Sequence, residues 1–246
     1  MGNRGFYSST GKFCNGRPRK PLLQKVFTKN QRRIGHHGKF AHPQAARILL
    51  RIFSGKPSKP KIMIDQQSSL PFARAYWVVP GRLMAGYYPG DVHPQTQTKK
   101  LAALLDAGVD RIINLMEVDE VDAQGRKFRL YQQELTQLAG KRGVGMEISR
   151  FPIPDLNVPT RQQMRMILDA LDGALALGRH VYVHCRGGIG RTGTVVGCFI
   201  ARHGLAAGQE VLTRIAELRR LLPDPIGISP ETAAQTRMVI GWQEGE

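Results

Sequence analysis

A cysteine and an arginine lie six positions apart in the segment Val181–Gly193, and glycines occupy three of the five positions between them. Glycines allow backbone conformations closed to other residues, so a loop of this kind can turn its N–H groups inward. A helix that begins near Arg191 would direct the positive end of its dipole at the same point. Arg191 adds a planar fork that holds two phosphoryl oxygens at once. The spacing therefore predicts a cradle for a tetrahedral dianion around Cys185.

Cys185 lies where a thiol ionises readily. Free thiols titrate near pH 8.5, whereas helix N-termini and nearby cations favour the thiolate, so we expect a nucleophilic sulfur. The other cysteines give no comparable signal. Cys198 lies seven residues after Arg191, roughly 10 Å further along the predicted helix, which is too far for a disulfide with Cys185. We expect Cys198 in the core and assign no role to Cys14.

Two nucleotide-binding sequence motifs partly match this loop. The glycines at 188, 190 and 193 match the dinucleotide fingerprint, but that motif needs a second strand ending in an acid about 20 residues later, and residues 205–222 have a helical pattern. A Walker A loop needs Gly-Lys followed by Ser or Thr, and here the chain has Gly-Arg-Thr. A structural turn would explain the glycines alone. It would not explain the cysteine and the arginine at the two ends of the loop.

The segment His184–Thr192 matches H-C-x5-R followed by Ser or Thr, and through this motif the chain resembles the cysteine-dependent protein tyrosine phosphatases. The similarity covers roughly Tyr76–Trp242 and is greatest to the compact dual-specificity branch, which includes kinase-associated and bacterial relatives. The low-molecular-weight branch is disfavoured because its similar loop lies near the N-terminus. The resemblance implies an α/β fold, with a mostly parallel central sheet of 4–5 strands and helices on both faces.

The resemblance also implies a role for each residue of the motif. Cys185 is the expected nucleophile, which forms a phosphocysteine intermediate, and Arg191 is expected to hold the phosphoryl oxygens. His184 is expected to orient the loop and favour the thiolate, and Thr192 to offer its hydroxyl to the sulfur as the intermediate breaks down. The loop amides are expected to bind phosphate with Arg191, and they belong to Arg186, Gly187, Gly188, Ile189 and Gly190.

The leaving oxygen needs a proton, and the segment Phe151–Pro159 (FPIPDLNVP) offers Asp155, 30 residues before Cys185. In the family an aspartate on a mobile loop gives this proton and then acts as the base for water, so Asp155 is the expected general acid. An aspartate among prolines is also ordinary turn chemistry. The segment has no Trp before Pro-Asp, unlike the larger tyrosine-specific enzymes, which leaves its mode of closure open.

Several other polar residues have two readings. Gln235 resembles a family element that positions water near the phosphate, and it is equally well explained as a solvated helix glutamine. Three acids after a predicted strand could line the substrate mouth, but we favour a solvated acidic loop; they are Glu117, Asp119 and Glu120. Arg186 is either a cation that favours highly charged substrates or a rim charge without consequence.

These residues predict a hydrolase, namely a protein tyrosine or dual-specificity phosphatase whose partner is a phosphoprotein, with phosphotyrosine favoured. Two alternatives stay open: a phosphoinositide or RNA 5′-phosphate phosphatase, and a non-catalytic phosphate-binding module. We expect no metal or other cofactor. Three cysteines in 246 residues exclude a disulfide framework and favour a cytoplasmic location. No apolar run reaches the roughly 18 residues of a transmembrane segment.

The elements that must position these residues alternate between strand and helix patterns. Two short runs separated by Pro80-Gly81 predict a hairpin at a sheet edge, and further strands are predicted at 109–116, 145–153 and 180–184. Helices are predicted at 96–107, 128–139, 160–178, 192–203, 208–222 and 230–242. Such alternation predicts a mostly parallel sheet, in which ligands bind beyond the carboxyl ends of the strands.

The charge divides the chain into two parts. Of 36 basic and 19 acidic residues, 15 basic residues and one acid lie in residues 1–70, which therefore carry +14 of the net +17. We expect residues 1–70 to be a disordered extension and residues 71–246 to be the catalytic domain. The extension could bind an anionic partner, either nucleic acid or a membrane surface. It could also be a transit peptide, a solvated tail, or a segment upstream of a start at Met63.

Overall fold

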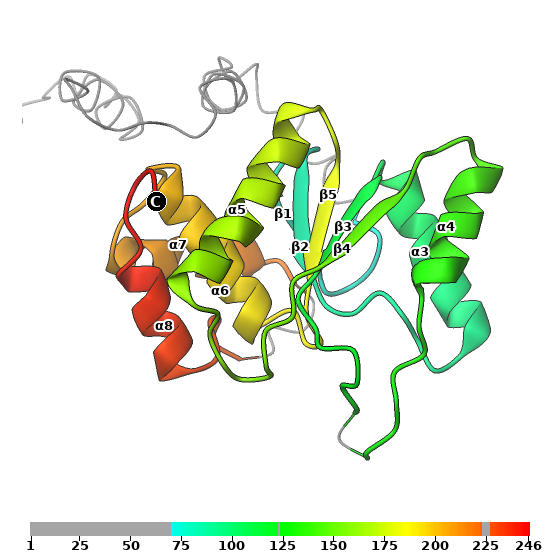
Figure 1. Ribbon diagram of the computed structural model, residues 1–246, viewed down its shortest axis with the longest axis horizontal. Helices are drawn as coiled ribbons and strands as arrows, with labels where there is room; N and C mark the ends of the chain where they lie inside the picture. Colours follow the sequence, from blue (N-terminus) through cyan, green and yellow to red (C-terminus); the bar gives the residue numbers. More distant parts are fainter. Residues whose placement is uncertain (1–69, 123, 223–226) are drawn as a thin grey trace, which may run out of the picture. The chain divides into compact units, whose positions relative to one another are not determined.

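A five-stranded sheet lies at the centre of the fold, with the strand order β1-β2-β5-β3-β4 (Figure 1). The computed structural model describes residues 70–122, 124–222 and 227–246, so the expectations for residues 1–69 lie outside the described part. The α/β class and the mostly parallel sheet are confirmed. The strands are β1 (Ala75–Val79), β2 (Leu83–Gly86), β3 (Arg111–Asn114), β4 (Glu147–Arg150) and β5 (Val181–His184).

The sheet brings the carboxyl ends of four strands to one edge. β1 and β2 form the expected antiparallel hairpin, and β2, β5, β3 and β4 run parallel. The last residues of these parallel strands are in register, since His184 pairs with Gly86 and Asn114, and Asn114 pairs with Arg150. The loops that follow these strands therefore leave the sheet side by side. In a parallel sheet this edge is where ligands bind.

The described residues form six helices, which cover both faces of the sheet. In Figure 1, α5, α6, α7 and α8 lie on one side, and α3 and α4 lie on the other. Thr160 caps α5 as expected, because its side chain accepts a hydrogen bond from the Gln163 amide at 3.1 Å. The helices are α3 (Pro94–Asp106), α4 (Gln132–Lys141), α5 (Arg161–Ala176), α6 (Gly190–Arg202), α7 (Gln209–Arg219) and α8 (Ala233–Ile240).

The central elements are buried as their apolar sequences predict. All four residues of β5 are buried, which suits a β-branched run in the middle of a parallel sheet. α6 is buried along almost its whole length and packs against β2 and β5. Gly197 permits close approach to α8, because a Cβ atom there would lie 2.7 Å from both methyl groups of Val239. The loop between β5 and α6 is therefore anchored at both ends by buried elements.

Two helices begin at least three residues later than their sequence patterns predict, and the first of them, α4, begins at Gln132 and not at 128. α8 begins at Ala233 and not at 230, because Thr232 is extended and forms a capping box with Gln235. The remaining elements differ from their predicted ranges by a few residues at their ends. No helix within the described ranges is both long and apolar enough to cross a membrane.

Candidate active site

The loop between β5 and α6 forms a ring around the Cys185 sulfur. Cys185 is buried, and its Sγ accepts a hydrogen bond from the Gly188 amide at 3.3 Å. Gly188 has a φ of 70°, and a Cβ atom there would lie 2.5 Å from the Gly86 carbonyl carbon. Only glycine fits this left-handed position and this close approach. α6 begins at Gly190, so its positive dipole end faces the loop as expected.

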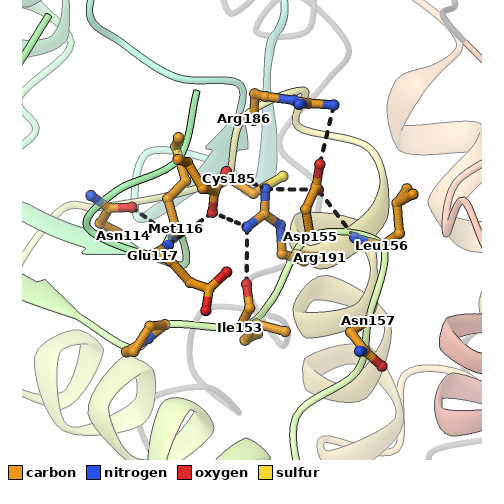
Figure 2. Close-up of polar contacts among 12 residues, drawn as sticks. Asn114, Met116, Glu117, Ile153, Asp155, Leu156, Asn157, Cys185, Arg186 and Arg191 are labelled. Carbon is orange, nitrogen blue, oxygen red and sulfur yellow. Dashed lines mark hydrogen bonds and ion pairs between the residues drawn. The ribbon is translucent and has the colours of Figure 1, made fainter. Parts of the chain in front are cut away.

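Arg191 is fully buried and lies among acceptors from two neighbouring loops (Figure 2). Its two terminal nitrogens bind the two Glu120 oxygens, and Nη1 also donates to the Ile153 carbonyl at 2.9 Å. Burial by itself lowers the pKa of Arg191, but the hydrogen bonds with Glu120 and the nearby negative groups raise the pKa above its ordinary value. The guanidinium therefore stays charged and is fixed in orientation.

The structure corrects the expectation of a wholly solvated acidic loop after β3. Glu117 and Asp119 are exposed, as expected, but the Glu120 side chain is only 9% exposed and is paired with Arg191. Glu120 also accepts the Glu117 amide at 2.8 Å, which fixes the loop. The position of three acids after a strand that adjoins β5 was a usable signal. It did not indicate which acid turns inward.

Asp155 lies on the loop between β4 and α5 and reaches the same ring. Its Oδ1 is 2.9 Å from Arg191 Nη2, and its Oδ2 is 3.1 Å from Arg186 Nη2. Figure 2 shows the carboxylate between the two guanidinium groups, close to Cys185. The next residue, Leu156, has a φ of 61°, and its amide donates to Asp155 Oδ1 at 3.1 Å. The structure therefore brings Asp155 together with Cys185 and Arg191.

His184 is buried behind the loop and forms hydrogen bonds at both ring nitrogens. Nδ1 lies 3.2 Å from the Cys185 carbonyl and Nε2 lies 2.7 Å from the Tyr131 hydroxyl. Burial lowers the pKa of His184 to about 3, and the charges of Arg150 and Arg191 act in the same direction. The ring is therefore neutral at pH 7: Nδ1–H donates to the carbonyl and Nε2 accepts from Tyr131. Tyr131 had no role in the sequence-based prediction, since a tyrosine inside a predicted helix (128–139) looks like any core residue.

Thr192 and Gln235 are both buried near the loop. The Thr192 hydroxyl donates to the Gly86 carbonyl at 3.4 Å. Gln235 Nε2 donates to the Asn157 carbonyl at 3.0 Å, and its Oε1 accepts the amides of Glu231 and Thr232. Gln235 therefore ties the Asp155 loop to the start of α8, and the reading as a solvated helix glutamine is wrong.

Two further expectations concern cysteine and metal chemistry. Cys198 lies in the core as predicted, and both Cys198 and Cys185 are free thiols. Burial raises the pKa of the Cys198 thiol well above its ordinary value, so this thiol is inert at neutral pH. Within the described ranges, no group of three His, Cys, Asp or Glu side chains is arranged to hold a metal ion.

Comparisons with known proteins support the fold described above. A family model described as "Swiss Army Knife protein, DSP-PTPase phosphatase domain" matches residues 72–236, which is about two thirds of the chain. The crystal structure of Tk-PTP in its active form is 22% identical, with a TM-score of 0.50 over 68% of this chain and 95% of that one. Kinase associated phosphatase is 18% identical, with a TM-score of 0.53 over 68% and 90%. These two structures share the fold.

A third structure and one curated relative complete the comparison. PTPMT1 in complex with PI(5)P is 20% identical, with a TM-score of 0.50 over 68% of this chain and 93% of that one. The uncharacterised protein MJECL20 of Methanocaldococcus jannaschii is 41% identical over 54 residues, or 22% of this chain. The match spans 37% of the length of that relative.

Proposed function

The chain belongs to the DSP-PTPase phosphatase family, and from this premise we propose that it hydrolyses phosphomonoesters through a phosphocysteine intermediate on Cys185. One observation carries the proposal. The Cys185 sulfur accepts the Gly188 amide within the loop between β5 and α6, the buried guanidinium of Arg191 lies at the start of α6, and the Asp155 carboxylate reaches this guanidinium from the loop after β4. This is the arrangement that phosphoryl transfer to a thiolate requires: a nucleophile, charge stabilisation and a proton donor.

The first step transfers the phosphoryl group to sulfur. The Cys185 thiolate attacks phosphorus, the bond from phosphorus to the leaving oxygen breaks, and that oxygen takes a proton from Asp155. Arg191 and the loop amides hold the three remaining oxygens as charge redistributes. Asp155 is paired with Arg191 as a carboxylate in the structure. An entering phosphate takes over that guanidinium, and the displaced Asp155 carboxylate takes up one proton from solvent and carries it to the leaving oxygen.

The second step regenerates the thiolate. Water attacks the phosphocysteine, the sulfur–phosphorus bond breaks, and Asp155 accepts the proton from water. We assign Thr192 to the departing sulfur, which requires its hydroxyl to leave the weak 3.4 Å contact with Gly86. Gln235 connects the start of α8 to the Asp155 loop. Through this contact it holds the Asp155 loop in place, and the attacking water must lie beside that loop. The neutral His184 ring donates a hydrogen bond to the Cys185 carbonyl and so helps to hold the loop in position.

We propose a phosphoprotein as the substrate, with phosphotyrosine favoured, in a reducing compartment such as the cytoplasm. The free Cys185 and Cys198 support that compartment. Arg186 supports a second candidate. Its side chain is 43% exposed beside the ring, where a second phosphate of a phosphoinositide or another polyphosphorylated substrate could pair with it.

The test is metal-independent turnover by the full chain. In EDTA, the wild-type protein should hydrolyse an aryl phosphate and be inhibited by vanadate, and Cys185→Ser should abolish turnover. Cys198→Ser is the matched control and should retain activity, because Cys198 lies in the core. Turnover that requires a divalent metal would refute the mechanism. Phosphopeptide binding without turnover would favour a non-catalytic module, and comparison of phosphotyrosyl peptide, phosphoseryl peptide, phosphoinositide and 5′-phosphorylated RNA would rank the substrates.

A further inference from the structure

Three carbonyl groups of the loop around Cys185 accept hydrogen bonds from donors outside the loop. In a planar trans peptide, the carbonyl of one residue and the N–H of the next point in opposite directions. A hydrogen bond that fixes a carbonyl on the outside therefore turns the following amide toward the ring. The outside donors are the Tyr88 amide to Arg186 O at 3.1 Å, Arg219 Nη1 to Gly188 O at 2.8 Å, and Ser229 Oγ to Ile189 O at 2.8 Å.

The peptide between Gly188 and Ile189 is the one that most needs such a restraint. Gly188 has a φ of 70°, and glycine has the widest choice of backbone angles, so rotation of this peptide meets little intrinsic resistance. Ile189 O is held by the Gly193 amide at 3.1 Å as well as by Ser229. Among the described residues, Arg219 is the donor to Gly188 O. Arg219 therefore sets the direction of the Ile189 N–H.

Arg219 is buried at the position from which it makes this contact. It is the last residue of α7, it is only 7% exposed, and its guanidinium lies 6.0 Å from the ring centroid of Tyr76 on β1. Burial of a guanidinium is unfavourable unless its donors are used. One of the Arg219 donors, Nη1, binds the Gly188 carbonyl, 31 residues away in the sequence. The neighbouring Arg220 is exposed.

We propose that Arg219 is a positioning residue that locks the Gly188–Ile189 peptide with the Ile189 N–H directed at the bound phosphoryl group. This inference rests on the proposed function, because it assigns an oxyanion to the ring. Arg219 acts through the Gly188 carbonyl and touches no reacting atom. Without it, the peptide is free to rotate and present a carbonyl oxygen to the ring, where a dianion would be repelled.

The test measures oxyanion binding separately from turnover. Orthovanadate affinity is measured by titration calorimetry, and kcat and KM are measured with an aryl phosphate, for wild type, Arg219→Met, Arg219→Lys and the exposed control Arg220→Met. We expect Arg219→Met to weaken vanadate binding about tenfold and to raise KM by a similar factor, with a smaller change in kcat, since loss of a contact made in both ground and transition state appears mainly in KM. Arg219→Lys and added guanidinium ion should recover part of the loss. Arg220→Met should match wild type.

The outcomes are distinguishable from a failure to fold and from failure of the proposed function. Partial unfolding would lower apparent kcat in proportion to the folded fraction and leave KM unchanged, which would overturn the positioning role. Wild-type affinity for vanadate in Arg219→Met would overturn it as well. If Arg219→Met does not fold, Arg219→Gln replaces it, because its shorter side chain does not reach the Gly188 carbonyl. Wild-type affinity and KM in Arg219→Gln overturn the proposal, and a raised KM that guanidinium ion lowers supports it. A wild-type protein that binds vanadate but hydrolyses nothing would refute the proposed function, and the affinity series would still decide the role of Arg219.

Discussion

Removal of the Asp155 carboxylate should change oxyanion binding and turnover in opposite directions. In the structure this carboxylate lies 2.9 Å from Arg191 Nη2 and 3.1 Å from Arg186 Nη2. It therefore occupies part of the guanidinium surface that a phosphoryl group needs. The variant Asp155→Ala removes this competitor together with the proposed proton donor.

The exposure of the three side chains sets the size of the binding effect. The side chain of Asp155 is 34% exposed and that of Arg186 is 43% exposed, so solvent screens their ion pair and its contribution is small. Arg191 is 1% exposed, so its contact with Asp155 is the larger of the two. We take a total of about 1–2 kcal/mol for the two contacts. Release of Arg191 should then tighten vanadate binding by roughly 5–30-fold. Loss of a general acid should lower kcat by about 10²–10⁴-fold.

The assay pairs vanadate titration with steady-state kinetics on an aryl phosphate. Asp119→Ala is the matched control, since Asp119 is an exposed carboxylate on the neighbouring loop, and it should leave both quantities near their wild-type values. A variant Asp155→Ala with unchanged kcat would remove Asp155 from the mechanism. A variant with weaker vanadate binding would show that the carboxylate does not compete with the oxyanion for Arg191.

Three other changes test separate contacts of the site. Glu120→Gln should lower kcat/KM by roughly thirtyfold, because loss of the charged hydrogen bonds to Arg191 costs about 2 kcal/mol; steady-state kinetics measure this, and equal activity would refute it. His184 has a pKa of about 3 in the folded protein and near 6.5 in the unfolded chain, so below pH 7 the unfolded chain binds a proton that the folded protein does not. The unfolding free energy should therefore fall by about 2 kcal/mol as the pH is lowered from 7 to 5. Denaturant titrations should show the gap between wild type and His184→Gln narrowing over that range; a constant gap would contradict it. Gly188→Ala forces a side chain onto the Gly86 carbonyl in a left-handed conformation and should lower the unfolding free energy by about 1–3 kcal/mol and abolish turnover; a fully active variant would mean that the loop differs from the one described.

The fold and the position of Cys185 and Arg191 at the two ends of one loop were predictable because they follow from local patterns. The apolar run of β5 and the amphipathic run of α5 mark elements whose order implies a parallel sheet, and the sheet then places the loop ends together. Cys185 and Arg191 were predicted from spacing within a single loop. Asp155 was predicted from the resemblance, as an aspartate on the loop after a strand and 30 residues before Cys185. The sequence did not show that β3 separates that strand, β4, from β5.

The residues that sequence reasoning missed act through contacts between distant segments. Glu120 reaches Arg191 across 71 positions, and Tyr131 reaches His184 across 53. Neither lies in a motif, and nothing in the local pattern separates Glu120 from the exposed Glu117. Which acid turns inward depends on how the loop after β3 packs against α6, and that is decided by tertiary structure. The same reason hides Arg219 beside Arg220.

The two carboxylates that pair with Arg191 differ in burial and in the number of contacts they make. Glu120 is 9% exposed and binds both terminal nitrogens, whereas Asp155 is 34% exposed and binds one of them. Exchange of the buried carboxylate would leave a desolvated charge without its partner, which costs several kcal/mol. Exchange of the exposed carboxylate for an incoming dianion keeps Arg191 paired throughout. The carboxylate that leaves is therefore Asp155, whose departure from the guanidinium puts the proposed proton donor beside the newly bound ester.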